Sequence, residues 1–206
     1  WHATTGLEPA AGERRITLRV PVKLPGVDIA WNVPTLGNVE KPEDYYALMM
    51  LAGVLDGGTS ARLATRLVRD RKLAASASAD YSGIGRGGGL FSLSATPNPG
   101  VSLAQMEQAL RAEVADLATT PPGADEMQRV RAQVLASETF KKESNLGQAM
   151  SLGWVMTSGL PWQVADELAD GLGKVTPEQV SAVARTWLVP ERETTAWTLP
   201  TDGEEN

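Results

Sequence analysis

The sequence predicts an α+β fold, in which a mostly antiparallel sheet carries helices on one face. Two observations support this class. The expected elements follow the order strand, strand, helix, helix, strand, strand, four or five helices, strand, and the chain contains no internal repeat. Strands grouped in this way, rather than alternating one by one with helices, are typical of sheets that bury only one face.

Length and composition indicate one ordinary globular domain. The chain has 206 residues, of which 42% are hydrophobic and 21% are charged, and its formal net charge is −6. An acidic chain without a basic stripe argues against nucleic-acid binding. No apolar run approaches the roughly 18 residues that a membrane-spanning helix needs, so we expect no membrane insertion.

The near absence of histidine and cysteine restricts the chemistry. The chain has no cysteine, and its one histidine is His2. Disulfides, thiolate zinc sites and cysteine nucleophiles are therefore excluded. A serine triad would have to use His2, close to a chain end, where segments are commonly poorly ordered. Zero cysteine suits an oxidising or a reducing compartment equally.

Residues 15–22 and 27–33 each show the alternation of a half-buried strand. The apolar residues expected to face the core are Ile16, Leu18, Val20 and Val22 in the first strand, and Val27, Ile29, Trp31 and Val33 in the second. Because only a short Leu-Pro-Gly turn separates the two strands, we expect them to be neighbours in the sheet.

Two helices should follow. Pro42 suits the first helical position, and Gly57-Gly58 suits a helix end, because glycine tolerates positive φ. A second helix should begin at Ser60 or Thr59 as its cap. Gly57-Gly58 is also compatible with anion binding at that helix start, although a tight corner between two helices explains it more simply.

A strand over residues 73–81, a glycine-rich loop over 83–89 and a strand over 91–95 come next. The loop lacks the Gly-Lys-Ser/Thr of a phosphate-binding loop and precedes a strand rather than a helix. We therefore interpret it as a hairpin loop.

The second half is predicted to be helical until a closing strand at residues 194–199. Capping boxes at Ser102 and Thr176 mark two helix starts. A helix from Asp125 should bury Met127, Val130, Val134 and Leu135, and shorter helices are expected over 145–157 and 162–172. The domain should span residues 15–200, with a linker over 1–14 and a polar tail over 201–206.

Residue chemistry alone yields no catalytic constellation. The basic run Arg66, Arg69, Arg71 and Lys72 is typical of a solvated helix face. Acidic pairs are sequence neighbours, which do not face each other on a helix. Four tryptophans are expected in the core or at an interface: Trp154, Trp162, Trp187 and Trp197.

One stretch resembles the pitrilysin (insulinase-like) metallopeptidase family, at the start of its second, non-zinc domain. Residues 45–81 read YYALMMLAGVLDGGTSARLATRLVRDRKLAASASADY. The matching positions are Gly57, Gly58, Ser60, Arg62, Leu63, Leu67, Leu73 and Ala74, and residues 175–188 resemble the last helix of that domain. The similarity covers about residues 15–200.

The resemblance implies a clamshell that encloses peptides, with zinc held in the preceding domain by an H-x-x-E-H motif. This chain lacks that motif, so the fragment should bind no catalytic zinc. The opposing half of such enzymes usually supplies an Arg and, seven residues later, a Tyr that orient the substrate. Val68 and Ala75 occupy those two positions here, and the roles do not transfer to Arg69 or Tyr81.

The chain therefore resembles the zinc-bearing member of bacterial two-chain peptidases, whose partner chain carries the Arg/Tyr pair. The implied function is the C-terminal half of a periplasmic zinc metalloendopeptidase acting on peptides. In that enzyme the fragment, inactive alone, would be scaffold, chamber wall and heterodimer surface beside the N-terminal zinc domain. The alternatives are a non-catalytic assembly subunit of the same family and an unrelated small-ligand-binding domain.

Overall fold

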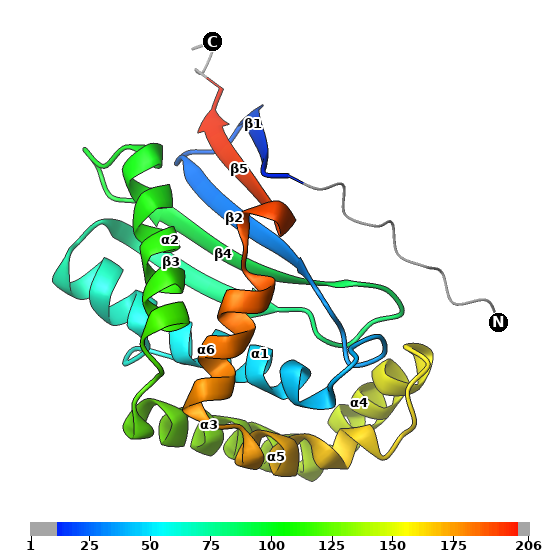
Figure 1. Ribbon diagram of the computed structural model, residues 1–206. Helices are drawn as coiled ribbons and strands as arrows, with labels where there is room; N and C mark the ends of the chain where they lie inside the picture. Colours follow the sequence, from blue (N-terminus) through cyan, green and yellow to red (C-terminus); the bar gives the residue numbers. More distant parts are fainter. Residues whose placement is uncertain (1–11, 202–206) are drawn as a thin grey trace.

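A computed structural model describes residues 12–201 (Figure 1). One five-stranded sheet has the order β1-β5-β2-β4-β3, and only the β1–β5 pair is parallel. The strands are β1 (Arg14–Val20), β2 (Gly26–Val33), β3 (Ala74–Tyr81), β4 (Gly89–Pro97) and β5 (Glu193–Pro200). His2, most of the expected linker and all of the expected tail except Thr201 lie outside the described residues.

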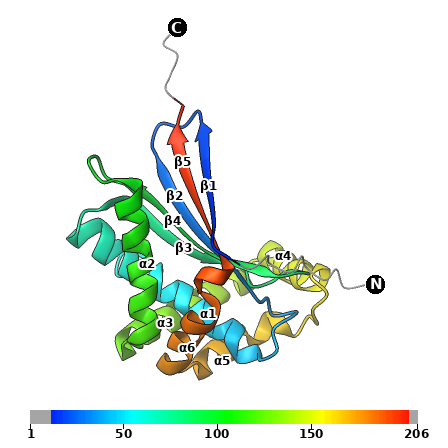
Figure 2. The same ribbon diagram turned by 45° about the horizontal axis from the view of Figure 1, so that its top comes forward.

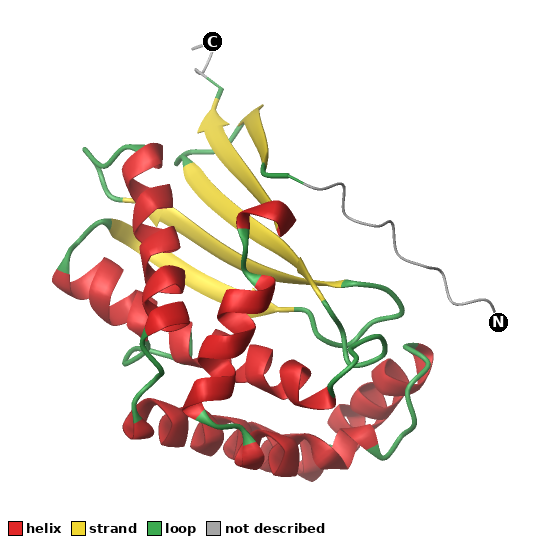
Figure 3. Ribbon diagram, viewed as in Figure 1, coloured by secondary structure: helices red, strands yellow, loops and turns green. Residues whose placement is uncertain are grey.

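Helices cover one face of this sheet (Figure 3). They are α1 (Pro42–Leu55), α2 (Leu103–Thr119), α3 (Ala124–Glu143), α4 (Asn145–Thr157), α5 (Val164–Lys174) and α6 (Pro177–Trp187). A π-helix η1 (Leu63–Asp70) and a 3-10 turn η2 (Pro190–Arg192) complete the fold. The predicted α+β class, with its mostly antiparallel sheet and one covered face, is confirmed.

The core lies between the sheet and helices α1, α2 and α6. Trp31, Ile29, Phe91 and Leu93 project from β2 and β4 and are at most 1% exposed. They meet apolar side chains of the helices that are also fully buried, namely Leu48, Leu51, Leu55, Met106, Leu110 and Val180. Burial of this kind contributes most of the free energy that favours folding.

The predictions for β1 were wrong in two respects. β5 lies between β1 and β2, so the first two strands are not neighbours. Ile16 and Leu18 are 46% and 47% exposed, because the parallel register places Ile16 beside Ala196 on the helix-free face. Arg15 takes the inner face instead, where its guanidinium stacks 5.0 Å from the Trp197 ring.

Local signals at helix ends were mostly confirmed. Ser102 and Thr176 both form complete capping boxes, with Gln105 and Gln179. The cap expected at Ser60 or Thr59 is wrong, because η1 begins later, with Arg62 at its N-cap and no side-chain cap bond. The glycine-rich segment joins β3 to β4, as expected for a hairpin loop.

Candidate functional site

The Gly57-Gly58 corner is a docking point for α3. The carbonyl oxygen of Gly57 accepts hydrogen bonds from Arg129 Nη1 and Gln133 Nε2, both at 2.6 Å. A Cβ on Gly57 would lie 2.4 Å from the Gly53 carbonyl oxygen, and Gly58 has φ +88°. Both glycines are therefore required by the backbone path, and the expected helix-to-helix corner is confirmed.

An ion-pair cluster holds η1 against α2 and α3. Arg62, only 7% exposed, donates from Nε and Nη2 to Glu126 at 2.7 and 2.9 Å and from Nη1 to Asp116 at 2.9 Å. Arg66 donates to Glu113 and Asp116 at 2.9 and 2.7 Å. The prediction of a merely solvated face was wrong for Arg66, because the carboxylates of α2 lie opposite it.

These contacts have a structural rather than a catalytic character. The hydrogen bonds from Arg62 lower the pKa of the Glu126 carboxyl, so this group stays ionised at neutral pH. A carboxylate locked in a bidentate pair is unavailable as a general base. Arg62 is one of the positions that match the family pattern. Its contacts in this fold give it a structural role, which is to hold η1 against α2 and α3.

Val68 and Ala75 lie in η1 and β3, at the edge of the sheet. Val68 packs against the core, whereas Ala75 is exposed beside a β-bulge between Ala74 and Ser76. Neither side chain can donate a hydrogen bond to a substrate carbonyl. β3 is an edge strand of the sheet, and neither of these two positions carries a donor side chain.

Arg69 and Tyr81, the arginine and tyrosine nearest to these positions in the sequence, both make contacts within the fold. Arg69 is exposed and donates to Thr65 Oγ1 at 3.1 Å. Tyr81 donates its hydroxyl to the Pro34 carbonyl oxygen at 2.6 Å, and burial raises its pKa. The Tyr81 hydroxyl is thus engaged within the fold.

The described residues do not fit a zinc site. Residues 12–201 contain no histidine or cysteine, and among the side chains described in that range no three Asp or Glu are grouped to hold a metal ion. Zinc prefers imidazole and thiolate ligands. No metal chemistry is therefore assigned to this part of the chain.

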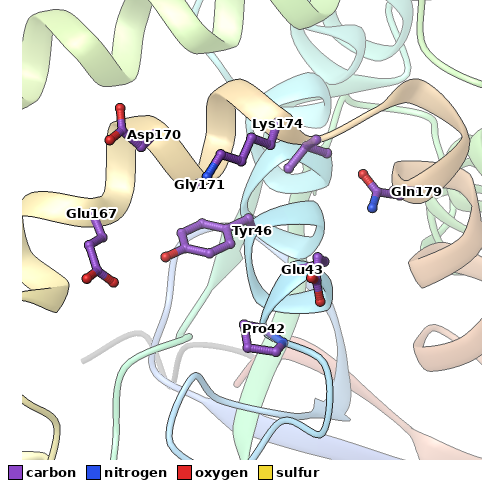
Figure 4. Close-up of a pocket in the computed structure, with 9 residues that line it drawn as sticks. Pro42, Glu43, Tyr46, Glu167, Asp170, Gly171, Lys174 and Gln179 are labelled. Carbon is purple, nitrogen blue, oxygen red and sulfur yellow. The ribbon is translucent and has the colours of Figure 1, made fainter.

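A pocket lies between the starts of α1 and α6 and the length of α5 (Figure 4). Its volume is about 550 Å³, and it is lined by Pro42, Glu43, Tyr46, Glu167, Asp170, Gly171, Lys174, Val175 and Gln179. Figure 4 shows Tyr46 between Glu167 on one side and Glu43 on the other. Gly171 makes room for the ring, because a Cβ there would lie 2.2 Å from Tyr46 Cε1.

This pocket lacks the parts of an active site. Desolvation and the nearby Glu167 carboxylate raise the pKa of Tyr46, so its hydroxyl stays protonated. The lining offers no nucleophile hydrogen-bonded to a base. Sequence reasoning missed the pocket, because its acidic residues come from helices far apart along the chain.

A second feature is an exposed apolar surface on α3, α4 and the start of the α5 segment. We call it the α4 surface. Its members are exposed by 37–73%: Leu135, Phe140, Leu146, Met150, Leu152, Trp154, Met156 and Trp162. Figures 1 and 2 show α4 projecting at one end of the molecule.

The α4 surface corrects one expectation. Leu135, expected inside, is 59% exposed. Trp154 and Trp162, expected in the core or at an interface, are 62% and 53% exposed and so lie outside the core of this chain. Trp187 and Trp197 do pack against the core, as predicted. Exposed large apolar side chains that share one face of a helix, as Leu146, Met150 and Trp154 do, are typical of interaction sites on soluble proteins. Among the described helices, none is long and apolar enough to cross a membrane.

Comparison with known proteins decides the family. No curated protein matches the chain. The family model described as the peptidase M16 inactive domain matches residues 1–134, well over half of the chain. The chain belongs to this family. The pitrilysin-like resemblance, to the domain that does not hold zinc, is confirmed.

Solved structures share the fold of this M16 inactive domain. A protease from Helicobacter pylori matches with TM-score 0.85 and 19% identity, over 94% of this chain and 46% of that one. The inactive peptidase domain of a candidate zinc protease from Bordetella parapertussis gives 0.78 and 23%, over 92% and 97%. The periplasmic protease PqqL from Escherichia coli gives 0.70 and 17%, over 93% and 21%.

The chain therefore spans slightly less than half of the Helicobacter protease and about the whole of the Bordetella domain. At these identities the structures establish the fold alone. The Helicobacter and Escherichia proteases are longer than this chain, and each contains a region of this fold.

Proposed function

We propose that this M16 inactive domain is the C-terminal half of a zinc metalloendopeptidase that degrades or processes peptides. The zinc site belongs to an N-terminal domain of the same protein. The domain described above acts as scaffold, as part of the wall of a peptide chamber, and as docking surface for the N-terminal half and for a partner chain. The proposal also places the enzyme in the periplasm, the compartment named for the similar PqqL protease.

The α4 surface is the observation that carries the proposal. Phe140, Leu146 and Met150 are 72%, 73% and 67% exposed, and Trp154 adds a large ring at 62%. Leu146, Met150 and Trp154 follow each other at intervals of four residues, so they form one stripe along α4. Such a stripe loses water-exposed apolar area when another domain covers it, which favours docking.

The helix-free face of the sheet supports the role of chamber wall. The alternation of the central strands points mostly small and uncharged side chains to that face: Asp28, Ala30, Asn32, Leu90, Ser92, Ser94, Thr96, Thr194, Ala196 and Thr198. A wall of mostly short side chains leaves room for a bound peptide and makes few strong contacts with it. Such a wall suits peptides of varied sequence better than one defined substrate.

The identities of Val68 and Ala75 favour the proposal that a second chain takes part. A substrate carbonyl needs hydrogen-bond donors as charge develops on its oxygen. Neither Val68 nor Ala75 supplies one, and the Tyr81 hydroxyl is bonded to Pro34. The proposed partner chain contributes the missing Arg/Tyr pair, so the active enzyme is a heterodimer.

The test is zinc content and cleavage of an unfolded peptide by the longer protein, with and without the product of the neighbouring gene. We expect stoichiometric zinc and cleavage only when both chains are present. Absence of zinc from the longer protein would contradict the proposal and favour the alternative, a non-catalytic assembly subunit.

A pair of surface variants tests the docking role separately. Met150→Glu with Trp154→Glu places two charges on the α4 surface and should abolish co-purification of the two halves expressed as separate chains. Ala112→Glu, on the exposed side of α2, is the matched control and should leave it intact. Equal co-purification in all three proteins would show that the α4 surface is not the docking site.

A further inference from the structure

The two edge strands of the sheet, β1 and β3, present different edges. β3 has a β-bulge near its start, and its Ala79 N–H donates to Asp56 Oδ2 at 3.1 Å. Both features hinder the addition of a further strand. β1 pairs with β5 in one uninterrupted register over all seven of its residues, and no described residue pairs with its outer edge. β1 is therefore the edge that is better suited to accept a strand.

Three residues of β1 direct their backbone polar groups outward. The carbonyl oxygen of Val20 accepts a hydrogen bond from Thr201 N at 3.0 Å, so the backbone of Val20 faces β5. In a parallel pair, alternate residues bond to the neighbouring strand, and the residues between them point away from it. Arg15, Thr17 and Arg19 therefore present their N–H and C=O groups along the open edge.

The side chains along β1 combine apolar surface with positive charge. Ile16 and Leu18 lie next to each other on the helix-free face, and both are nearly half exposed. Arg14, Arg19 and Lys23 are exposed, and no described carboxylate lies within ion-pair distance of them. This strand thus carries unpaired cations in a chain whose net charge is −6.

The carboxylates described near β1 do not cancel this charge. Three of them are at most 2.8 Å from a nitrogen of Arg15 or Arg111: Glu13, Glu107 and Glu193. On the helix-free face, Asp28 lies beyond β5, on β2, and accepts a hydrogen bond from Ser94 Oγ at 2.6 Å. Positive charge therefore remains in excess along the outer edge.

We propose that the outer edge of β1 binds an extended peptide in which acidic and apolar residues alternate, as a sixth strand of the sheet. Backbone hydrogen bonds to Arg15, Thr17 and Arg19 supply the affinity. Because side chains alternate along a strand, the apolar ones meet Ile16 and Leu18 on the helix-free face, and the acidic ones meet Arg19 on the other face. The proposal concerns binding alone and does not depend on the peptidase function.

The charge of β1 disfavours a second copy of this chain as the occupant. Antiparallel pairing of two β1 strands about Thr17 would place Arg15 of one copy opposite Arg19 of the other. Like charges directly opposite each other destabilise a sheet, whereas opposite charges stabilise it. An acidic peptide therefore fits this edge better than a copy of β1.

The test is a titration of the ¹⁵N-labelled 206-residue chain with acetyl-Glu-Val-Glu-Val-Glu-Val-Glu-amide at low salt. We expect saturable binding with a Kd below about 1 mM. The amide signals of Arg15, Thr17 and Arg19 should shift most and should gain protection from hydrogen exchange, while the signals of β3 stay in place. Absence of saturable binding would overturn the proposal, as would binding that shifts β3 instead of β1.

Control peptides separate charge, apolar contact and backbone pairing. Replacing every Glu by Lys, or every Val by Ser, should weaken binding at least about fivefold. Two N-methylated forms of the acidic peptide carry the methyl groups either on two Glu or on two Val nitrogens. One form should lose binding and the other should keep it, because backbone direction alternates along a strand. Equal affinity of all these peptides would contradict strand addition.

Matched substitutions on β1 locate the site. Thr17→Pro removes an outward N–H, which an edge strand tolerates, and should abolish binding, whereas Thr17→Val keeps the N–H and should preserve it. Arg14→Glu with Arg19→Glu should weaken binding at least about tenfold. Arg69→Glu with Arg71→Glu makes the same change of net charge at the exposed end of η1 and should have little effect. If Thr17→Pro fails to fold, the two charge variants decide. Equal binding by both of them would overturn the proposal.

Discussion

Helices α1 and α4 are nearly equal in length and similar in apolar content, yet one is buried and the other is exposed. Of the 14 residues of α1, seven are buried, including Leu48, Leu51 and Leu55. Of the 13 residues of α4, Val155 is the one that is buried. Two helices of similar composition thus differ strongly in solvent exposure.

The difference lies in their partners. α1 packs against α3, α5, α6 and β3, all within this chain. α4 packs against α3 and α5 on one side and leaves Leu146, Met150 and Trp154 uncovered. An apolar helix face that stays uncovered within its own chain is typical of a surface that another domain covers. We propose that a second domain covers α4.

The largest expected effect comes from truncating a leucine in each helix. Leu51→Ala in α1 should lower the free energy of unfolding by about 2–5 kcal/mol, because Leu51 is fully buried and a cavity would remain. Leu146→Ala in α4 should change it by less than about 0.5 kcal/mol, because Leu146 is 73% exposed. Urea denaturation of the isolated chain measures both. Similar losses would contradict the comparison.

Arg62 tests the corner that follows α1. Arg62→Met removes the contacts to Glu126 and Asp116 and should cost about 2–3 kcal/mol. This value is below the usual figure for a fully buried pair, because both carboxylates are partly exposed. Thermal and urea unfolding of the variant give the value. A loss below about 0.5 kcal/mol would show that the cluster contributes little.

Two glycine-to-alanine substitutions should change the free energy of unfolding in opposite directions. Gly53→Ala in α1 places a Cβ 2.5 Å from Val130 Cγ1, and overpacking should lower stability by about 1–2 kcal/mol. Gly153→Ala in α4 meets nothing within 4 Å and should raise stability by about 0.5–1 kcal/mol through helix propensity. Urea denaturation distinguishes the signs, and destabilisation by Gly153→Ala would mean that α4 is more tightly packed than described.

The smallest expected effect is a pH dependence. Arg62 lowers the pKa of Glu126 from its ordinary 4.5, so the pair stabilises the fold above that pH and the contribution is lost as the pH falls through the lowered pKa. The stability difference between the unmodified chain and Arg62→Met should therefore shrink from pH 7 to about pH 3. Trp154→Ala is the control, because α4 carries no acidic residue. A difference independent of pH would exclude this linkage.

Much of the fold was predictable from local signals. Capping boxes at Ser102 and Thr176 and the glycine corner at Gly57-Gly58 depend on neighbouring residues, and the structure confirms all three. The burial of β1 was not predictable in this way. Its alternation is real, but the parallel pairing with β5, which is distant in sequence, decides which face meets the helices.

The functional features were less predictable, for two physical reasons. The pocket beside Tyr46 is formed by α1, α5 and α6, and α1 is far from the other two along the chain, so no local spacing predicts the pocket. The exposure of Trp154 and Trp162 depends on which surface is left after the core has closed. The apolar character of these rings favours their burial, but the sequence does not indicate which surface would cover them.

Hydrogen exchange of the α4 backbone, residues 145–157, tests the central claim most directly. It should be measured in the isolated 206-residue chain and in the longer protein assembled with its partner chain. We predict slower exchange across α4 in the assembly, while α1 exchanges slowly in both. Exchange in α4 that stays equally fast after assembly would contradict the claim that the α4 surface is a docking surface.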